Sequence, residues 1–236
     1  MAETKNRQIT KKNDFVEIKF TGYLKGVPFD SNIEEDLKKI HPEAKPQETI
    51  VVIGQSMVVP GLDKDLEGKE INKFYSIHLL PKEGFGVRDR NLVKTIPLRV
   101  FTEKQINPYP GLVLNMDNTI AKVIAVSGAR VVMDFNNPLA GKEIDYTYKI
   151  TRIIDDENEK IKVLFNQLLK FIPDFEVNEK IIVKGQKQLE LFVNSLKEKF
   201  KELIGKDLVF QEKDKKRDLE KTVSESNKGN KEEKVN

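Results

Sequence analysis

Apolar and polar side chains alternate along the first part of the chain with the two-residue period of a β-strand. In residues 14–24, Glu17 and Lys19 separate apolar neighbours. Such alternation predicts a strand with one face buried and the other face in water. The β-branched run at 50–53 and the segment at 74–80 predict two further strands.

Helical spacing appears in a short segment between these strands. Leu62 and Leu66 lie four residues apart, on one face of a helix, and Gly68 is a suitable C-terminal cap. A helix of about two turns is stable only when it packs on another element, so we expect it to cover a sheet. One more helical turn is expected at 34–40, within an otherwise polar loop.

The pattern changes between residues 87 and 135, where prolines punctuate short apolar stretches. Three β runs are expected in this region, and Ser127-Gly128 is a hairpin signal between the last two. They are residues 112–116, 120–126 and 130–135. These runs predict a small β-rich unit, after which a strand at 143–154 follows.

The last third of the chain combines two amphipathic helices with short strands. Apolar residues recur at helical spacing in 161–172 and again in 189–204. Short strands are expected at 175–177, 181–183 and 208–210, which gives the order α-β-β-α-β. Both helical faces are interpreted as core, with a dimer surface or a client groove as the alternative. Residues 213–236 are highly charged and nearly free of apolar side chains, so we expect them to be disordered.

Composition narrows the function classes for these 236 residues. There is no cysteine, which excludes disulfides and thiolate chemistry and is typical of a reducing compartment. A net charge of +3 from 41 basic and 38 acidic residues does not call for a nucleic-acid partner. Only His41 and His78 could supply imidazole, so we expect no metal site, no cofactor and no histidine-dependent triad. No apolar stretch is long enough for a membrane span, and the start lacks the apolar core of a signal peptide, so we expect a cytoplasmic protein with no membrane partner.

Three motifs occur in order in the first part of the chain. They are VEIKFTGYLKGVPFDS at 16–31, VVIGQSMVVPGLDKDLEG at 51–68 and LPKEGFGVRD at 80–89. Together they resemble the signatures of the FKBP-type peptidyl-prolyl isomerases: a strand with Thr-Gly and Phe-Asp-Ser, an aliphatic pair before a short helix, and the loop that closes the pocket. The resemblance implies an antiparallel sheet with one short helix.

The same resemblance assigns a catalytic pocket. It falls on Phe20, Phe29, Asp30, Val58, Val59, Leu62, Phe85 and Tyr146. Phe20 and Phe85 stand where the family commonly has Tyr, and Leu62 stands where many eukaryotic members have Trp. These departures put affinity for macrolide ligands in doubt more than they do the isomerase activity.

About 50 residues separate the pocket loop from the last strand, where a small FKBP has a short flap. This resembles the SlyD-like branch, whose insert-in-flap domain binds unfolded chains. Residues 91–101 and 134–146 resemble the two ends of that insert. The expected client contacts are Ile96, Leu98, Phe101, Ile106, Tyr109 and Leu112, as an exposed groove. The alternative is that these side chains pack inside the insert or against the FKBP domain. The C-terminal unit resembles the extension of long-type archaeal members, and the histidine-rich metal tail of SlyD has no counterpart here.

The expected fold class is therefore α+β. An FKBP domain, 1–90 and 136–154, is interrupted by the insert at 91–135, and a C-terminal α+β domain at 155–212 precedes the charged tail at 213–236. The expected function is prolyl cis/trans isomerisation in unfolded or nascent polypeptides, coupled to chaperone binding through the insert, with a homodimer through the C-terminal domain. The alternative is a non-catalytic chaperone or assembly module on an FKBP scaffold.

An apolar pocket suits this reaction because the planar amide is polar and the twisted transition state has lost that charge separation. Asp30 is the candidate for orienting the twisted amide, and not for proton transfer. Its plainer interpretation is a turn or capping residue. Aromatic residues on strands are otherwise most often core.

Overall fold

The structure is a computed structural model that describes residues 8–116 and 119–213. The chain divides into two compact units, residues 1–153 and 154–236. The predicted disordered tail lies outside the described residues from 214 onward. No helix among the described residues is both long enough and apolar enough to cross a membrane.

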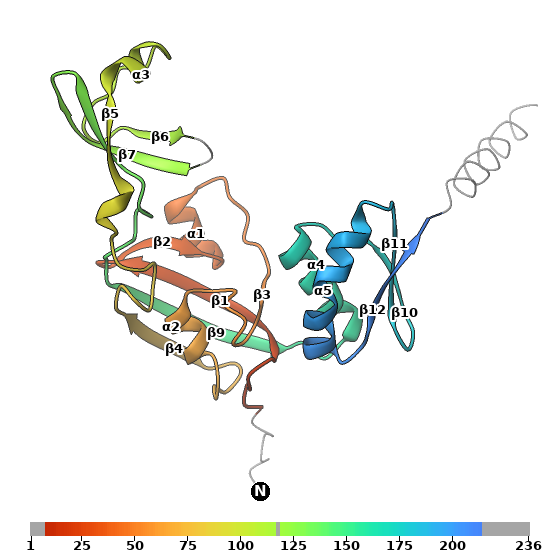
Figure 1. Ribbon diagram of the computed structural model, residues 1–236. Helices are drawn as coiled ribbons and strands as arrows, with labels where there is room; N and C mark the ends of the chain where they lie inside the picture. Colours follow the sequence, from red (N-terminus) through yellow and green to blue (C-terminus); the bar gives the residue numbers. More distant parts are fainter. Residues whose placement is uncertain (1–7, 117–118, 214–236) are drawn as a thin grey trace, which may run out of the picture. The chain divides into compact units, whose positions relative to one another are not determined.

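An antiparallel sheet forms the body of the first unit (Figure 1). Its strand order is β2-β1-β9-β4, and β3 pairs with the other end of β1. The strands are β1 (Phe15–Leu24), β2 (Val27–Ser31), β3 (Thr49–Val52), β4 (Phe74–Leu79) and β9 (Ile144–Ile153). We call this the main sheet.

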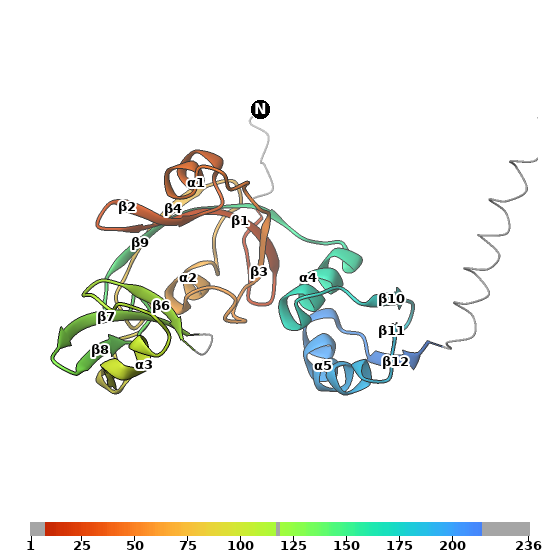
Figure 2. The ribbon, with the colours of Figure 1, turned by 90° about the horizontal axis from the view of Figure 1, so that it is seen from above.

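The alternation along β1 sends its side chains to two covered faces. Val16 and Ile18 belong to a buried core that also contains Leu62 and Leu66, so helix α2 (Pro60–Asp65) covers this face. On the opposite face, helix α1 (Glu34–Ile40) is tied to the strand. The Thr21 hydroxyl donates to Asp36 Oδ2 at 2.9 Å, and the Tyr23 hydroxyl donates to the same oxygen at 3.2 Å. Figure 2 shows the two helices on opposite sides of the sheet. The wet face predicted for this strand is therefore partly covered.

A second antiparallel sheet, which we call the insert sheet, stands at one end of this unit (Figure 1). Its order is β5-β8-β7-β6. The strands are β5 (Val93–Pro97), β6 (Val113–Met116), β7 (Thr119–Ser127) and β8 (Arg130–Asp134). Helix α3 (Leu98–Thr102) places Phe101 in a buried core with Ala121, Val123, Val131 and Met133. The last three strands were predicted, whereas β5 and α3 were not, because Pro97 interrupts their pattern.

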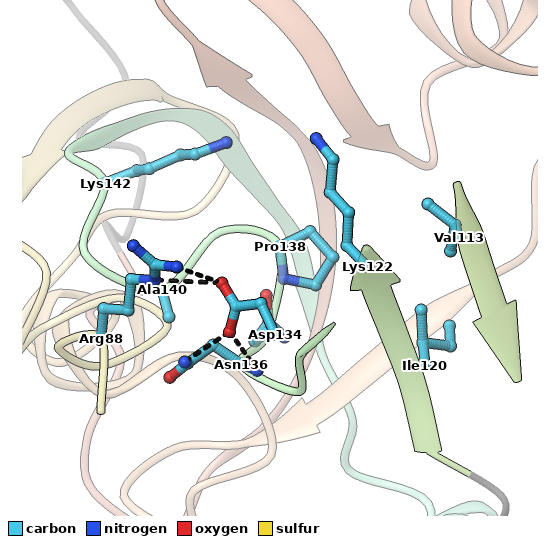
Figure 3. A pocket seen from close by; sticks show the side chains of 10 residues that line it. Arg88, Val113, Ile120, Lys122, Asp134, Asn136, Pro138, Ala140 and Lys142 are labelled. Carbon is cyan, nitrogen blue, oxygen red and sulfur yellow. Dashed lines mark hydrogen bonds and ion pairs between the residues drawn. The ribbon is translucent and has the colours of Figure 1, made fainter. Parts of the chain in front are cut away.

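Two chain segments connect the main sheet with the insert sheet, one where the chain enters the insert and one where it returns. The short 3-10 helix η1 (Arg90–Leu92) follows Asp89. The Asn136 amide group donates to the Asp89 carbonyl at 2.9 Å, and the Asp89 N–H donates to Asn136 Oδ1 at 2.8 Å. Figure 3 shows Arg88 and Asn136 bound to the two oxygens of Asp134. Hydrogen bonds between these two segments thus hold the junction between the sheets.

The second unit has the predicted order α-β-β-α-β. Its elements are α4 (Glu157–Leu169), β10 (Asp174–Val177), β11 (Ile181–Gly185), α5 (Leu189–Ile204) and β12 (Leu208–Glu212). Strand β11 pairs antiparallel with β10 and parallel with β12, because α5 crosses between β11 and β12. The Phe165 and Phe200 rings pack at 4.7 Å between the helices. Asp156 caps α4 by accepting from the Glu159 N–H at 2.7 Å.

Candidate active site

The pairing of three strands brings the predicted pocket residues of the main sheet into one row. Gly22 on β1 pairs with Asp30 on β2 and, on its other side, with Tyr146 on β9. Tyr146 in turn pairs with Ile77 on β4. Directly paired residues in a sheet point to the same face, so this row faces α2 and the buried core. Ile77 was not predicted, although the alternation of β4 places it on this face.

A β-bulge explains how Phe29 and Asp30 both reach this face. Asp30 pairs with Gly22 but Pro28 pairs with Tyr23, so Phe29 is the extra residue on β2. Neighbours in a regular strand point to opposite faces, and a bulge redirects one of them. The Phe29 ring consequently packs edge-on against Tyr146 at 5.9 Å.

Gly22 leaves the space that these rings occupy. A Cβ atom on this residue would lie 2.7 Å from Phe29 Cζ and 2.9 Å from Tyr146 Cε1. Both distances are well below ordinary carbon–carbon contact of about 3.5–4.0 Å. The glycine of the Thr-Gly motif is therefore required by the close approach of the two rings.

Phe20 and Phe85 complete an aromatic cluster, which we define as Phe20, Phe29, Phe85 and Tyr146. Phe20 lies 6.1 Å from Tyr146, and Phe85 packs edge-on against Phe29 at 5.9 Å. Tyr146 is buried, whereas the three phenylalanines are half-buried. The cluster therefore presents ring surface to solvent while resting on the core.

The loop that carries Phe85 is fixed by backbone hydrogen bonds. The Gly61 N–H at the start of α2 donates to the Glu83 carbonyl at 2.8 Å, and the Gly86 N–H donates to the Pro81 carbonyl at 2.7 Å. Gly86 has a φ of +81°, a conformation that favours glycine. The loop thus closes tightly behind Phe85.

The aliphatic pair before α2 is anchored by a residue that was not predicted, Asp63. Its buried carboxylate accepts from the Gly54 N–H at 2.8 Å and from the Ser56 N–H at 2.9 Å. This holds the turn that leads into Val58 and Val59, which lie half-buried against the same core. An acidic residue in the first turn of a predicted helix was the available signal. Leu62, which the family resemblance places in the pocket, is only 1% exposed and lies in the core.

Asp30 is the carboxylate of this site. It remains exposed to solvent, yet partial burial beside the rings raises the pKa of its carboxyl, and a hydrogen bond from the Ser31 N–H opposes the change. Burial, together with the charge of Asp30, raises the pKa of the Tyr146 hydroxyl. Tyr146 is therefore a neutral donor at physiological pH, next to an acceptor. Among the described residues, no three His, Asp or Glu side chains are arranged to hold a metal ion.

This arrangement presents half-buried aromatic ring surface with one acceptor, the Asp30 carboxylate, and one donor, the Tyr146 hydroxyl, beside it. It can seat an apolar ring and orient a polar amide, and it needs no covalent step.

Comparison with known families agrees with this geometry. The family model of FKBP-type peptidyl-prolyl cis-trans isomerases matches residues 6–99, and the model described as FKBP26, IF domain matches residues 94–139. The chain belongs to the FKBP-type peptidyl-prolyl cis-trans isomerases with an insert-in-flap domain. The expected family, fold class and enzyme class are thereby confirmed. The exact bounds of the domains and the roles of the individual site residues stay predictions.

Relatives of this isomerase occur in archaea and bacteria. It is 29% identical over 154 residues to the short-type peptidyl-prolyl cis-trans isomerase of Methanocaldococcus jannaschii, a match that covers 64% of this chain and 98% of that protein. It is 29% identical over 121 residues to the SlyD isomerase of Haemophilus influenzae, covering 46% of this chain and 58% of SlyD. For the SlyD of Aeromonas hydrophila the identity is 30% over 99 residues, covering 41% and 47%.

The predicted client groove of the insert requires a correction. Phe101 is 1% exposed and forms the insert core, so it is not a surface contact. Ile96, Leu98, Ile106 and Leu112 are half-buried against that core, and only Tyr109 is well exposed. The short helix α3 turns this segment so that its apolar side chains face the insert core, which the proline-rich sequence did not indicate. The exposed large apolar side chains among the described residues of the insert are instead Leu92, Tyr109, Val113, Ile120 and Ile124.

Proposed function

We propose that this isomerase rotates X-Pro bonds in unfolded polypeptides that its insert-in-flap domain holds close to the aromatic cluster. The observation that carries the catalytic part is the convergence of four aromatic rings beside one carboxylate. The support for the client-binding part is the exposed apolar surface of the insert.

Rotation about an X-Pro bond is limited by the partial double-bond character of the amide, with a barrier of about 18–20 kcal/mol. Acceleration from the uncatalysed time of tens to hundreds of seconds to milliseconds needs about five decades, or about 7 kcal/mol. In the proposed mechanism Phe29, Phe85 and Tyr146 seat the proline ring and exclude water. The planar, more polar ground state is then disfavoured relative to the twisted amide. Asp30 orients the substrate and transfers no proton.

Deletion of the insert tests the coupling of the two activities. Asp89 and Asn136 already exchange two hydrogen bonds, so a short Gly-rich linker between them can replace residues 91–135. We expect turnover of an Ala-Pro tetrapeptide within about twofold of full length, and an acceleration of proline-limited refolding that falls at least tenfold. The variant Phe85→Ala, with the insert present, should lose both activities and serves as the matched comparison.

Two results would contradict the proposal. If the deleted form still suppresses aggregation of an unfolded client as well as full length does, the insert is not the client site. If a folded fragment of residues 1–154 does not turn over the tetrapeptide, the alternative of a non-catalytic scaffold is favoured.

A dimer through the C-terminal unit is a second proposal on partners. An apolar groove of about 600 Å³ lies between α4, α5 and the residues that follow β11. The exposed side chains of Leu168, Phe171 and Phe192 line it. A second copy of the chain would cover this surface. Sedimentation analysis of the full chain should report a dimer that Phe171→Ser with Phe192→Ser converts to a monomer, and a monomeric wild-type chain at micromolar concentration would reject the idea.

A further inference from the structure

A cavity of about 400 Å³ opens between the outer face of the insert sheet and the segment that returns to the main sheet (Figure 3). Val113 and Ile120 line it from β6 and β7, and Pro138 lines it from the returning segment. Val113 is 56% exposed and Ile120 is 57% exposed, so both offer apolar surface to an occupant. The cavity is separate from the aromatic cluster, none of whose residues lines it.

One pair of charges in the cavity wall is already matched. Arg88 donates from Nε at 3.0 Å and from Nη2 at 2.6 Å to Oδ2 of Asp134. The other oxygen of Asp134 accepts from the N–H and the side-chain amide of Asn136, at 3.0 and 2.6 Å. Burial works against ionisation, but the hydrogen bonds from Asn136 and Arg88 outweigh it and lower the pKa of Asp134. The carboxylate therefore stays ionised and is occupied by these partners.

Two further basic side chains line the cavity without an acidic partner among the described residues. Lys122 pairs with Asp134 in the register of β7 and β8, but the carboxylate turns toward Arg88. Within the described residues, neither Lys122 nor Lys142 has an ion-pair partner. Figure 3 shows both amino groups extended toward the same edge of the cavity. With Arg88 neutralised by Asp134, the two lysines leave the cavity with an excess of positive charge beside apolar walls.

We propose that this cavity, which we call the lysine cavity, binds an acidic side chain of the client polypeptide, so that the isomerase prefers X-Pro bonds with Asp or Glu a few residues away. This inference rests on the proposed function and specifies its substrate class. A carboxylate flanked by apolar residues fits two unmatched ammonium groups beside Val113, Ile120 and Pro138.

The connection to the aromatic cluster sets the spacing. Lys142 precedes Tyr146 by four residues, which corresponds to about 13 Å along an extended chain. The Gly141 N–H also donates to the carbonyl of Gly86, next to Phe85, at 2.8 Å, so the returning segment is tied to the pocket loop. An extended client with its acidic residue four to six positions from the proline can therefore occupy both places.

Binding of two fluorescein-labelled twelve-residue peptides tests the proposal on the full chain. Both contain one Ala-Pro bond and apolar neighbours, and they differ only in Glu or Gln five residues from the proline. By anisotropy at low salt we expect the Glu peptide to bind at least fivefold more tightly. Lys122→Gln with Lys142→Gln should bring the two affinities within twofold, and so should 0.5 M salt. Tetrapeptide turnover should be unchanged.

The matched control is Lys104→Gln with Lys197→Gln, which removes the same charge from exposed positions outside the cavity. It should retain the preference for Glu. Equal affinities of the wild-type chain for the two peptides, or an equal loss in the control, would overturn the inference, as would cavity-dependent binding of a labelled oligonucleotide in place of the Glu peptide. Because the Gln peptide reports client binding by itself, its failure to bind would instead refute the proposed function.

Discussion

Gly22→Ala tests whether the aromatic cluster is the catalytic site. The residue is buried in β1, between Asp30 and Tyr146, and its φ is not in the left-handed region. Alanine is therefore acceptable to the backbone, and the effect of the substitution must come from the side chains that the new methyl group meets.

The magnitude follows from the two contacts. At 2.7 Å from Phe29 Cζ and 2.9 Å from Tyr146 Cε1, the methyl group must push the rings apart by about 1 Å to reach ordinary contact. Overpacking of this kind costs about 1–3 kcal/mol of folding stability. A displacement of about 1 Å at a reacting centre can cost about 100-fold in rate. We expect kcat/KM to fall about 10- to 100-fold, equivalent to about 1.4–2.7 kcal/mol of transition-state stabilisation.

Protease-coupled turnover of an Ala-Pro tetrapeptide and urea unfolding measure the two effects. Gly26→Ala is the control, because this glycine has a φ of +79° but open space around its Cβ position. It should cost about 1 kcal/mol of stability through backbone strain and leave turnover within twofold. In a double-mutant cycle, Phe29→Leu removes the Cζ atom and should recover about 1 kcal/mol of the stability lost by Gly22→Ala. Wild-type turnover in folded Gly22→Ala would refute the assignment of the site.

Three further predictions concern individual residues. Phe29→Ala and Phe85→Ala should each lower tetrapeptide turnover at least tenfold, or about 1.4 kcal/mol, with the fold retained by circular dichroism; unchanged rates in both would place the pocket elsewhere. Burial raises the pKa of the Asp30 carboxyl above the ordinary 3.8, so the folded chain binds the carboxyl proton more tightly than the unfolded chain does. The stability therefore falls as the pH rises from the unfolded-state pKa of Asp30 to its higher folded-state pKa. Asp30→Asn should therefore raise the melting temperature at pH 7 but not well below pH 3.8, while turnover stays within a few-fold; an equal shift at both pH values would contradict the assigned cause. Asp63→Ala removes two charge-assisted hydrogen bonds and should cost about 2–3 kcal/mol in urea unfolding, with lower turnover from a loosened Val58 loop; a loss below 0.5 kcal/mol would show that water replaces the carboxylate.

The local periodicity of apolar residues was sufficient to predict most helices and strands of this protein. The alternation in 14–24 predicted β1, the spacing of Leu62 and Leu66 predicted α2, and the helical faces at 161–172 and 189–204 predicted α4 and α5. These patterns are readable because each element must bury one side, and the periods of 2 and 3.6 residues differ. Where Pro97 broke the pattern, β5 and α3 were missed.

The motifs also contain Phe20, Phe29 and Phe85, and the family resemblance added Tyr146, but the sequence alone did not determine how these four residues meet. The bulge at Phe29, the gap at Gly22 and the anchoring of Val58 by Asp63 depend on strand register and on contacts between distant residues. Register is a property of a pair of strands and is not encoded in either strand by itself. For the same reason Phe101 was predicted to be exposed, since the local sequence of a proline-rich segment does not show whether a sheet covers its apolar side chains. The sequence by itself determined which chemical groups the site residues carry. The tertiary structure determined on which face of a sheet each side chain lies, which residues it contacts and how exposed it is to solvent.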